Sequence, residues 1–333
     1  MQPGKVGQTV TVKDVLELVL EDLQRVDREI SRRSVAPVDA ITSIGHYLHG
    51  GGGKRLRPAL LLLSSKLVGG GGESAIRLAA VVEMIHTATL VHDDIIDMAE
   101  MRRGRPSPNV LWGNHTSVLA GDWLYMQSFH VALEERSFRV LDILIGLTQT
   151  MVEGELVQLE RLGSMSVAEA DYLDLVDRKT ASLFAACARL GAIVGEAPEP
   201  VEAALGEYAW NLGMAFQLVD DVLDFTARES VLGKPVGSDL KEGKVTLPLL
   251  YALDQAGPAE RRLVETVLDE GGYQSVAFAS VLAMVERHNG IERAMRRAEA
   301  FTERARRLIG GFPESPWQRA LHAMTDLVTD RDC

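Results

Sequence analysis

Two clusters of aspartates repeat one spacing in distant parts of the chain. The first is Asp93, Asp94 and Asp97, and the second is Asp220, Asp221 and Asp224. In a helix, residues four apart share a face, so the first and last carboxylates of each cluster lie together and repel one another. Both clusters lie among Ile, Leu and Val, where burying unpaired carboxylates would cost several kcal/mol. A single cluster could be a solvated helix end, but two copies in matching apolar contexts indicate that the carboxylates bind cations.

The types of side chain in these clusters favour magnesium. Neither cluster contains a cysteine, and no histidine stands at a matching position in both. Mg²⁺ prefers a few carboxylate ligands, completed by water and by phosphate oxygens. Two acidic patches that face one another, with several Mg²⁺ ions between them, would hold a diphosphate.

Basic residues that could complete such a site occur both before and directly after the first acidic cluster. Lys54, Arg55 and Arg57 lie where a glycine-rich loop enters a predicted helix, whose N-terminus favours anions. Taken alone, this loop could simply be solvated. Arg102 and Arg103 directly follow the first acidic cluster.

Two further candidates lie within predicted helices. Lys179 precedes Thr180 in a segment otherwise rich in Ala and Leu, where a lone lysine needs a partner or an outward route. His86 lies seven residues before Asp93 and eleven before Asp97, so the three fall within an arc of about 40° on one helix face. A core histidine is the usual interpretation, but this alignment favours a functional one. Two acidic walls and two sets of cations suit two diphosphates, one bridged through Mg²⁺ and one held by Lys and Arg directly.

Helical periodicity recurs along almost the whole sequence. Helices are predicted at 12–31, 38–49, 58–68, 74–98, 116–134, 138–162, 167–194, 201–226, 246–256, 259–270, 274–287, 291–309 and 315–330. Glycine-rich breaks separate several of them, and no stretch alternates apolar and polar residues long enough for a convincing strand. The prediction is an all-α fold with a single domain over residues 1–333.

The stretch 227–245 differs, because it carries three glycines and three lysines and has no helical stripe. An exposed connector is the simpler interpretation. Its place directly after the second acidic cluster also fits a mobile lid over an active site.

Composition argues against several classes of protein. The net charge of −12 disfavours nucleic acid as a partner. The longest nearly unbroken apolar run, at 58–68, is far shorter than the roughly 20 residues of a membrane span, and the N-terminus has no secretory apolar region. The two cysteines, Cys187 and Cys333, form no disulfide framework. We therefore expect a soluble, cytoplasmic protein.

The sequence resembles the trans-isoprenyl diphosphate synthases (polyprenyl synthetases) over most of its length. The residues that carry the resemblance are Gly52–Pro58, His86–Asp97, Arg102–Gly104, Trp112–Asn114, Gly121–Asp122, Lys179–Thr180, Phe216–Asp221 and Gly243–Lys244. Two aspartate-rich motifs together with the Gly-Lys-Arg-x-Arg-Pro loop form a very specific combination. Class I terpene cyclases carry a different second motif, and phytoene and squalene synthases space their aspartates more widely.

The resemblance implies a role for each matching residue. Asp93, Asp97 and Asp220 would bind Mg²⁺, three ions per active site, with Asp94, Asp221 and Asp224 supporting them in catalysis alongside Lys179. Lys54, Arg57, His86 and Arg103 would hold isopentenyl diphosphate. Arg102, Lys179, Thr180, Gln217, Lys234 and Lys244 would hold the allylic diphosphate.

The resemblance also implies a bundle of antiparallel helices around a deep cavity, usually in a homodimer. Members of the family join an allylic diphosphate to isopentenyl diphosphate and release pyrophosphate. The allylic C–O bond ionises, the double bond of isopentenyl diphosphate attacks the carbocation, and a proton is lost. The released pyrophosphate can accept that proton, so the lack of an obvious side-chain base is no objection.

The residues just before the first acidic cluster bear on product length. In the family, bulky aromatic residues there stop chain growth early, whereas Ala88 and Thr89 leave the cavity open. A helical wheel places Thr89 about 40° from Asp93 but Ala88 about 140° away, so geometry favours Thr89. The stretch 151–159 also resembles long-chain members.

The prediction is therefore a long all-trans polyprenyl diphosphate of seven to ten units, made from a farnesyl- or geranylgeranyl-type starter. No transmembrane segment is expected, although the lipid product could be handed to a membrane. Two alternatives stay open. One is a geranylgeranyl diphosphate synthase whose block comes from another helix, and the other is a non-catalytic partner subunit of a heterodimeric synthase.

Overall fold

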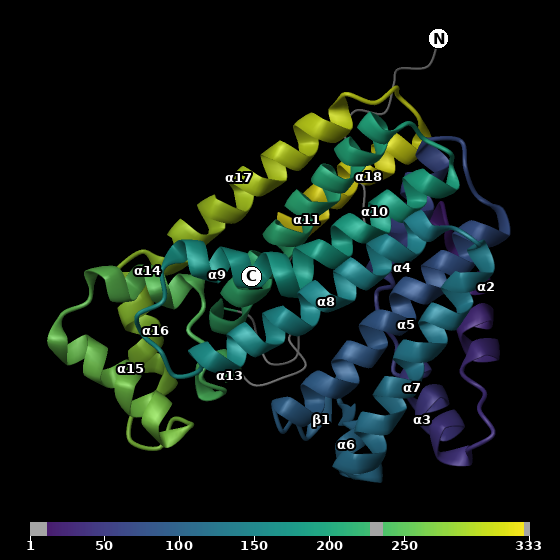
Figure 1. Ribbon diagram of the computed structural model, residues 1–333. Helices are drawn as coiled ribbons and strands as arrows, with labels where there is room; N and C mark the ends of the chain where they lie inside the picture. The colour runs from purple at the N-terminus through teal and green to yellow at the C-terminus, as the bar shows by residue number, and fades with distance from the viewer. Residues whose placement is uncertain (1–11, 227–235, 330–333) are drawn as a thin grey trace.

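The computed structural model describes residues 12–226 and 236–329, and almost all regular structure in these ranges is helical (Figure 1). The α-helices are α1 (Val12–Glu17), α2 (Leu20–Arg33), α3 (Asp39–His49), α4 (Leu56–Leu67), α5 (Gly72–Ile96), α6 (Pro108–Trp112), α7 (Asn114–Ala132), α8 (Phe138–Arg161), α9 (Glu169–Val176), α10 (Ser182–Val194), α11 (Glu199–Thr226), α13 (Ser238–Lys241), α14 (Leu247–Gln255), α15 (Pro258–Glu270), α16 (Phe278–Arg287), α17 (Gly290–Gly310) and α18 (Pro316–Thr329). The remaining elements are a 3-10 turn, η1 (Leu133–Glu135), a π-helical turn, η2 (Asp177–Ala181), and two strands, β1 (Met101–Arg102) and β2 (Arg105–Pro106). The all-α prediction is confirmed.

The structure departs from the predicted elements in several places, and the short helices α6 and α13 lie where no helix was predicted. The first predicted helix is broken between α1 and α2, and the helix predicted at 167–194 widens into a π-helical turn at η2. Strands β1 and β2 form a tiny antiparallel hairpin that pairs Arg102 with Arg105. Its turn uses Arg103 and Gly104, both with positive φ, so the local turn and not apolar alternation produces these strands.

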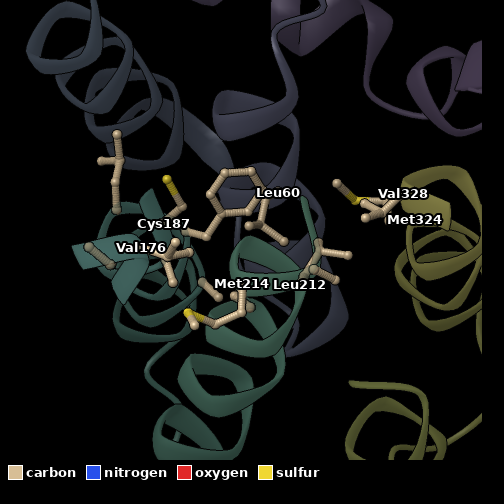
Figure 2. Close-up of a cluster of buried hydrophobic side chains, with 14 of the residues drawn as sticks. Leu60, Val176, Cys187, Leu212, Met214, Met324 and Val328 are labelled. Atoms are coloured by element: carbon tan, nitrogen blue, oxygen red, sulfur yellow. The ribbon is translucent and has the colours of Figure 1, made fainter. Parts of the chain in front are cut away.

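The core forms where α4, α10 and α11 pack on one another, with α18 behind them. Figure 2 shows side chains of this cluster, among them Leu60 from α4, Cys187 from α10, Leu212 from α11 and Met324 from α18. Gly191 lets α10 approach α4 closely, because a Cβ at Gly191 would lie 2.4 Å from the carbonyl oxygen of Leu61. This rigid centre fixes the helices that carry the acidic clusters.

Helix α5 is held on several sides. It packs against α2, α4 and α7, and most of its length is buried Ala, Val, Leu and Ile. By length and composition it could cross a membrane, but 67% of its most apolar window is buried inside the fold. It is therefore a core helix, and its C-terminal end delivers the first acidic cluster.

The remaining helices surround this centre. Helix α17 lies along α11, while α14, α15 and α16 gather at the end of the molecule away from α2 and α3 (Figure 1). The long helices α5, α7, α8 and α11 thus enclose the space into which the two acidic clusters point.

Candidate active site

One cavity of about 1160 Å³ receives both acidic clusters. Asp93 and Asp97 line it from the end of α5, and Asp220 and Asp221 line it from α11. The predicted basic and polar residues on its wall are Arg57, His86, Arg102, Arg103, Lys179, Thr180, Gln217 and Lys244. Residues far apart in the sequence therefore meet at one site. The second cluster contributes Asp220 and Asp221, and not the pair Asp220 and Asp224 that the four-residue spacing predicted.

Asp93 stands out because its carboxylate has no hydrogen bond or ion pair with any side chain in the described ranges. Burial raises the pKa of Asp93 to about 6, against the pull of Lys179, and repulsion from Glu155 and Asp97 adds to the rise. A bound cation would stabilise the ionised form of this buried, unpaired carboxylate. Asp97, which follows the last residue of α5, instead accepts a hydrogen bond from Lys244 Nζ at 2.9 Å.

Two of the three residues predicted to support the metal ligands, Asp94 and Asp224, do not lie on the cavity wall. Asp94 is 1% exposed, and its Oδ1 accepts a hydrogen bond from Arg102 Nε at 2.5 Å. Asp224 is also 1% exposed and accepts from Ser238 Oγ at 2.9 Å and from the backbone N–H of Asp239 at 3.2 Å. Asp94 therefore holds the side chain of Arg102 in place, and Asp224 anchors the backbone at the start of α13.

Asp221 lies deeper than Asp220 and accepts two hydrogen bonds. Tyr172 donates from its hydroxyl and Gln217 donates from its amide nitrogen, one to each carboxylate oxygen. Burial raises the pKa of Asp221, repulsion from Asp239 adds to this, and the two donors oppose it. Tyr172 is a site residue that the sequence alone did not single out.

Of the four residues predicted to hold isopentenyl diphosphate, three line the cavity and one, Lys54, does not. Arg57 Nη1 donates to His86 Nε2 at 3.1 Å, since a guanidinium has no acceptor. Burial and the nearby positive charge of Arg57 keep the pKa of His86 well below its usual value, so this imidazole is neutral. Arg103 also lines the cavity, and its guanidinium donates to the carbonyl of Gly52. Lys54, by contrast, is exposed and is not part of the cavity wall.

Two lysines predicted for the allylic diphosphate line the cavity from η2 and from the segment after α13. Lys179 Nζ donates to Gln158 Oε1 at 3.0 Å and also pairs with Glu155. Lys244 pairs with Glu242 at 2.8 Å as well as with Asp97, and these carboxylates raise its pKa although burial opposes the rise. Lys234 lies outside the described residues, as does the first part of the stretch proposed as a lid, 227–235.

The π-helical turn η2 presents Lys179 and Thr180 to the cavity. Gly154 makes room for this turn, because a Cβ there would lie 2.8 Å from Arg178 Cβ and 3.0 Å from Lys179 Cγ. Trp210 Nε1 donates to Asp177 Oδ1 at 2.6 Å and ties the turn to α11. A wide turn of this kind is uncommon and is often found at functional sites.

Sequence reasoning missed the polar partners of Lys179. Glu155 and Gln158 lie three residues apart on α8 and both face the cavity. Residues three apart share a helix face, and this spacing is a signal that could have identified the pair. Tyr125, on α7, also lines the cavity, and burial raises its pKa to about 12.

The part of the cavity beyond the carboxylates is apolar. Thr89 lines it and donates to the carbonyl of His86 at 2.8 Å, whereas Ala88 is fully buried in the core and is not part of the wall. Met126 and Met151 continue the wall from α7 and α8. The helical-wheel preference for Thr89 over Ala88 therefore agrees with where the two side chains lie.

The residues present fit magnesium better than a metal held by protein alone. Within residues 12–226 and 236–329, no three His, Cys, Asp or Glu side chains are grouped closely enough to hold a metal ion. Mg²⁺ does not need such a group, since it takes one or two carboxylates together with water and phosphate oxygens. The carboxylate of Asp93, on the cavity wall, could supply one such ligand.

Comparison with known proteins gives consistent results. The family model described as polyprenyl synthetase matches residues 38–285. The octaprenyl diphosphate synthase of Haemophilus influenzae is 38% identical over 97% of this chain and 98% of its own length. The geranylgeranyl diphosphate synthase of Methanosarcina mazei is 43% identical over 68% of this chain and 74% of its own. The crystal structure of a polyprenyl synthase from Caulobacter crescentus, in complex with calcium and isoprenyl diphosphate, superimposes with a TM-score of 0.93 at 34% identity, covering 98% of this chain and 99% of that one.

Proposed function

Because this chain belongs to the polyprenyl synthetase family, we propose that it is a trans-prenyltransferase that condenses an allylic diphosphate with isopentenyl diphosphate and releases pyrophosphate. The observation that carries this function is the meeting of two acidic clusters and two groups of cations in one cavity with an apolar extension. The acidic side suits a metal-bridged diphosphate, and the apolar side suits a hydrocarbon chain.

The two diphosphates would bind at separate places. Arg57 and Arg103, with neutral His86 beside them, would hold isopentenyl diphosphate between α4 and α5. Lys179 on η2 and Lys244 after α13 would hold the allylic diphosphate. Charge-assisted hydrogen bonds of this kind are the strong ones, and each of these lysines would exchange a carboxylate partner for a phosphate oxygen.

Asp93, Asp97 and Asp220 would hold Mg²⁺, for which we propose three ions per site. The ions would neutralise charge that develops on the departing pyrophosphate. The chain's own cations Lys179 and Lys244 would stabilise the same charge, and the apolar wall would keep water from the allylic carbocation. The allylic C–O bond breaks, the new C–C bond forms at isopentenyl diphosphate, and the lost proton passes to pyrophosphate.

The apolar extension favours a long product. Just before the first acidic cluster, the cavity wall carries Thr89 and no bulky aromatic side chain. Met126 and Met151 continue the same wall from α7 and α8. The relative from Haemophilus influenzae is named for an eight-unit product, while the one from Methanosarcina mazei is named for a four-unit product. We therefore propose seven to ten units, with the four-unit product as the alternative.

One incubation tests the proposed function. The purified chain is given Mg²⁺, labelled isopentenyl diphosphate and farnesyl diphosphate, and the dephosphorylated products are sized by mass spectrometry. Products of seven to ten units would support the proposal, and an end point at four units would replace it with the alternative. If the chain shows no turnover alone, it is a partner subunit of a heterodimeric synthase.

A homodimer is proposed from the surface beside the cavity. Helices α7 and α8 expose a set of large apolar side chains, some of which also border the cavity. The set is Val118, Leu119, Met126, Phe138, Ile145, Val152, Leu156 and Leu159, and of these Leu119, Phe138 and Ile145 are not part of the cavity wall. Exposed apolar patches of this kind are typical of protein interfaces. Leu119→Glu should shift the chain from dimer to monomer in light scattering, whereas the control Leu20→Glu, on the exposed face of α2, should not. A wild-type chain that is monomeric at micromolar concentration would contradict the proposal.

Cys187 is a buried free thiol, which is consistent with the cytoplasmic location that we propose. The lipid product would then be transferred to a membrane.

A further inference from the structure

A chain of hydrogen bonds crosses the cavity wall from α9 to the π-helical turn. Tyr172 donates to Asp221 Oδ2 at 2.5 Å, and Gln217 Nε2 donates to Asp221 Oδ1 at 2.8 Å. The same Gln217 side chain accepts at Oε1 from Thr180 Oγ1 at 2.9 Å. Thr180 is the neighbour of Lys179, so the chain ends beside a cation of the allylic site.

The donors around Asp221 set the direction of the bonds in this chain. Because Tyr172 donates to one oxygen of Asp221 and the Gln217 amide nitrogen donates to the other, the amide carbonyl of Gln217 faces Thr180. Thr180 must then donate its single hydroxyl proton to Gln217. The side chains of Gln217 and Thr180 therefore have one orientation as long as Asp221 stays where it is.

Tyr172 is the group that holds Asp221 from the far side. Its side chain is 5% exposed and that of Asp221 is 4% exposed, so water has little access to replace the tyrosine hydroxyl. Tyr172 and Thr180 also lie eight residues apart in one continuous helical stretch, α9, η2 and α10, and both reach across to α11. Tyr172 thus fixes both the carboxylate and the register of the stretch that presents Lys179.

Building on the function proposed above, we propose that Tyr172 is a positioning residue for the allylic diphosphate subsite. It acts through Asp221 and Gln217, and it sets the orientation of Thr180 beside Lys179. Without its hydroxyl, Asp221 Oδ2 loses its donor, the carboxylate can rotate, and the amide of Gln217 loses its fixed orientation. The isopentenyl subsite at Arg57 is separate and should not change.

The test uses Tyr172→Phe in the full chain, with Tyr208→Phe as the matched control. Tyr208 is equally buried, and its hydroxyl donates to the carbonyl of Leu321 far from the cavity. Calorimetry with Mg²⁺ and an unreactive thio-analogue of farnesyl diphosphate should show about tenfold weaker binding or more for Tyr172→Phe, the loss expected for one hydrogen bond to a charged group. The KM for isopentenyl diphosphate should stay within about twofold of wild type in both variants.

A double-mutant cycle separates positioning from a general structural effect. Thr180→Val alone should weaken analogue binding, and adding Tyr172→Phe should weaken it little further, because both act on one chain of bonds. Tyr208→Phe should instead combine with Thr180→Val additively. If Tyr172→Phe does not fold, Gln217→Leu takes its place in the same cycle, since it cuts the chain between Asp221 and Thr180.

Three outcomes overturn the inference: wild-type analogue binding in Tyr172→Phe, equal losses for the two substrates, or full additivity with Thr180→Val. These outcomes are interpreted only if the wild-type chain elongates the allylic substrate in the same assay. A wild-type chain that does not elongate would refute the proposed function instead, so the two failures are distinguishable.

Discussion

Replacing Asp93 by asparagine should make the metal-free protein more stable while it abolishes turnover. In the folded chain, burial raises the pKa of Asp93 from its usual 3.8 to about 6. The folded state therefore holds a proton that the unfolded state releases between these two values. The stability from this proton is present below about pH 4 and is lost as the pH rises through 6. At pH 8 the ionised carboxylate then costs up to ~3 kcal/mol, because each pKa unit corresponds to about 1.4 kcal/mol.

Asparagine is similar in size to aspartate but uncharged, so Asp93→Asn should recover most of this free energy of unfolding. For a chain of this length the melting temperature should rise by about 2 °C per kcal/mol, or up to ~6 °C at pH 8. At pH 5 the gain should fall to about half, since part of the wild-type carboxylate is then protonated. Differential scanning calorimetry in EDTA, at the two pH values, measures both numbers.

Asp97→Asn is the matched control, because Asp97 is paired with Lys244 and its loss should lower the melting temperature or leave it unchanged. Adding Mg²⁺ with pyrophosphate should reverse the order, with wild type gaining more than Asp93→Asn from ligand binding. A melting temperature for Asp93→Asn at or below wild type in EDTA at pH 8 would refute the reasoning. A gain that is the same at pH 5 would refute the assigned cause.

Two further predictions concern the substrates. Arg57→Ala should raise the KM for isopentenyl diphosphate about ten- to a hundredfold, and Lys179→Ala should act mainly on the allylic substrate, since each loses a charge-assisted hydrogen bond; equal effects on both substrates in steady-state kinetics would show that the subsites are not separate. Thr89→Phe should shorten the product to about three or four units while early condensations survive, because the ring enters the apolar wall. Thr87→Phe, on the same helix but off the cavity wall, should leave the mass of the product unchanged, and a shortened product there would contradict the path beside Thr89.

The helices and the acidic walls could be predicted from sequence because both depend on local spacing. Residues four apart on one helix share a face, and this rule correctly placed Asp93 with Asp97 on the cavity wall. It failed for the second cluster, because Asp224 is buried against Ser238 while Asp220 lines the cavity. The same rule, applied to Ala88, correctly separated it from the cavity face. A helical wheel also predicts that Asp94 points about 100° away from Asp93. In the structure Asp94 accepts a hydrogen bond from Arg102.

The rest of the site depends on pairs that no local rule connects. Lys244 and Asp97 are 147 residues apart in sequence, and Tyr172 and Asp221 are 49 apart. Such partners follow only from how α5, α9 and α11 pack. The exposure of Lys54 likewise depends on the path of its loop, which composition does not determine.

The π-helical turn at Asp177–Ala181 makes this segment sensitive to chain length as well as to side-chain identity. Its extra residue sets the rotation of α10 relative to α9, and one residue corresponds to about 100° of helix rotation. Deleting any single residue there would turn Tyr172 and Leu183 out of register with each other, so that either the hydrogen bond from Tyr172 to Asp221 or the core packing of Leu183 would be lost. Variants of this protein should therefore tolerate substitution at Arg178, which is not part of the cavity wall, but almost no insertions or deletions between 177 and 181.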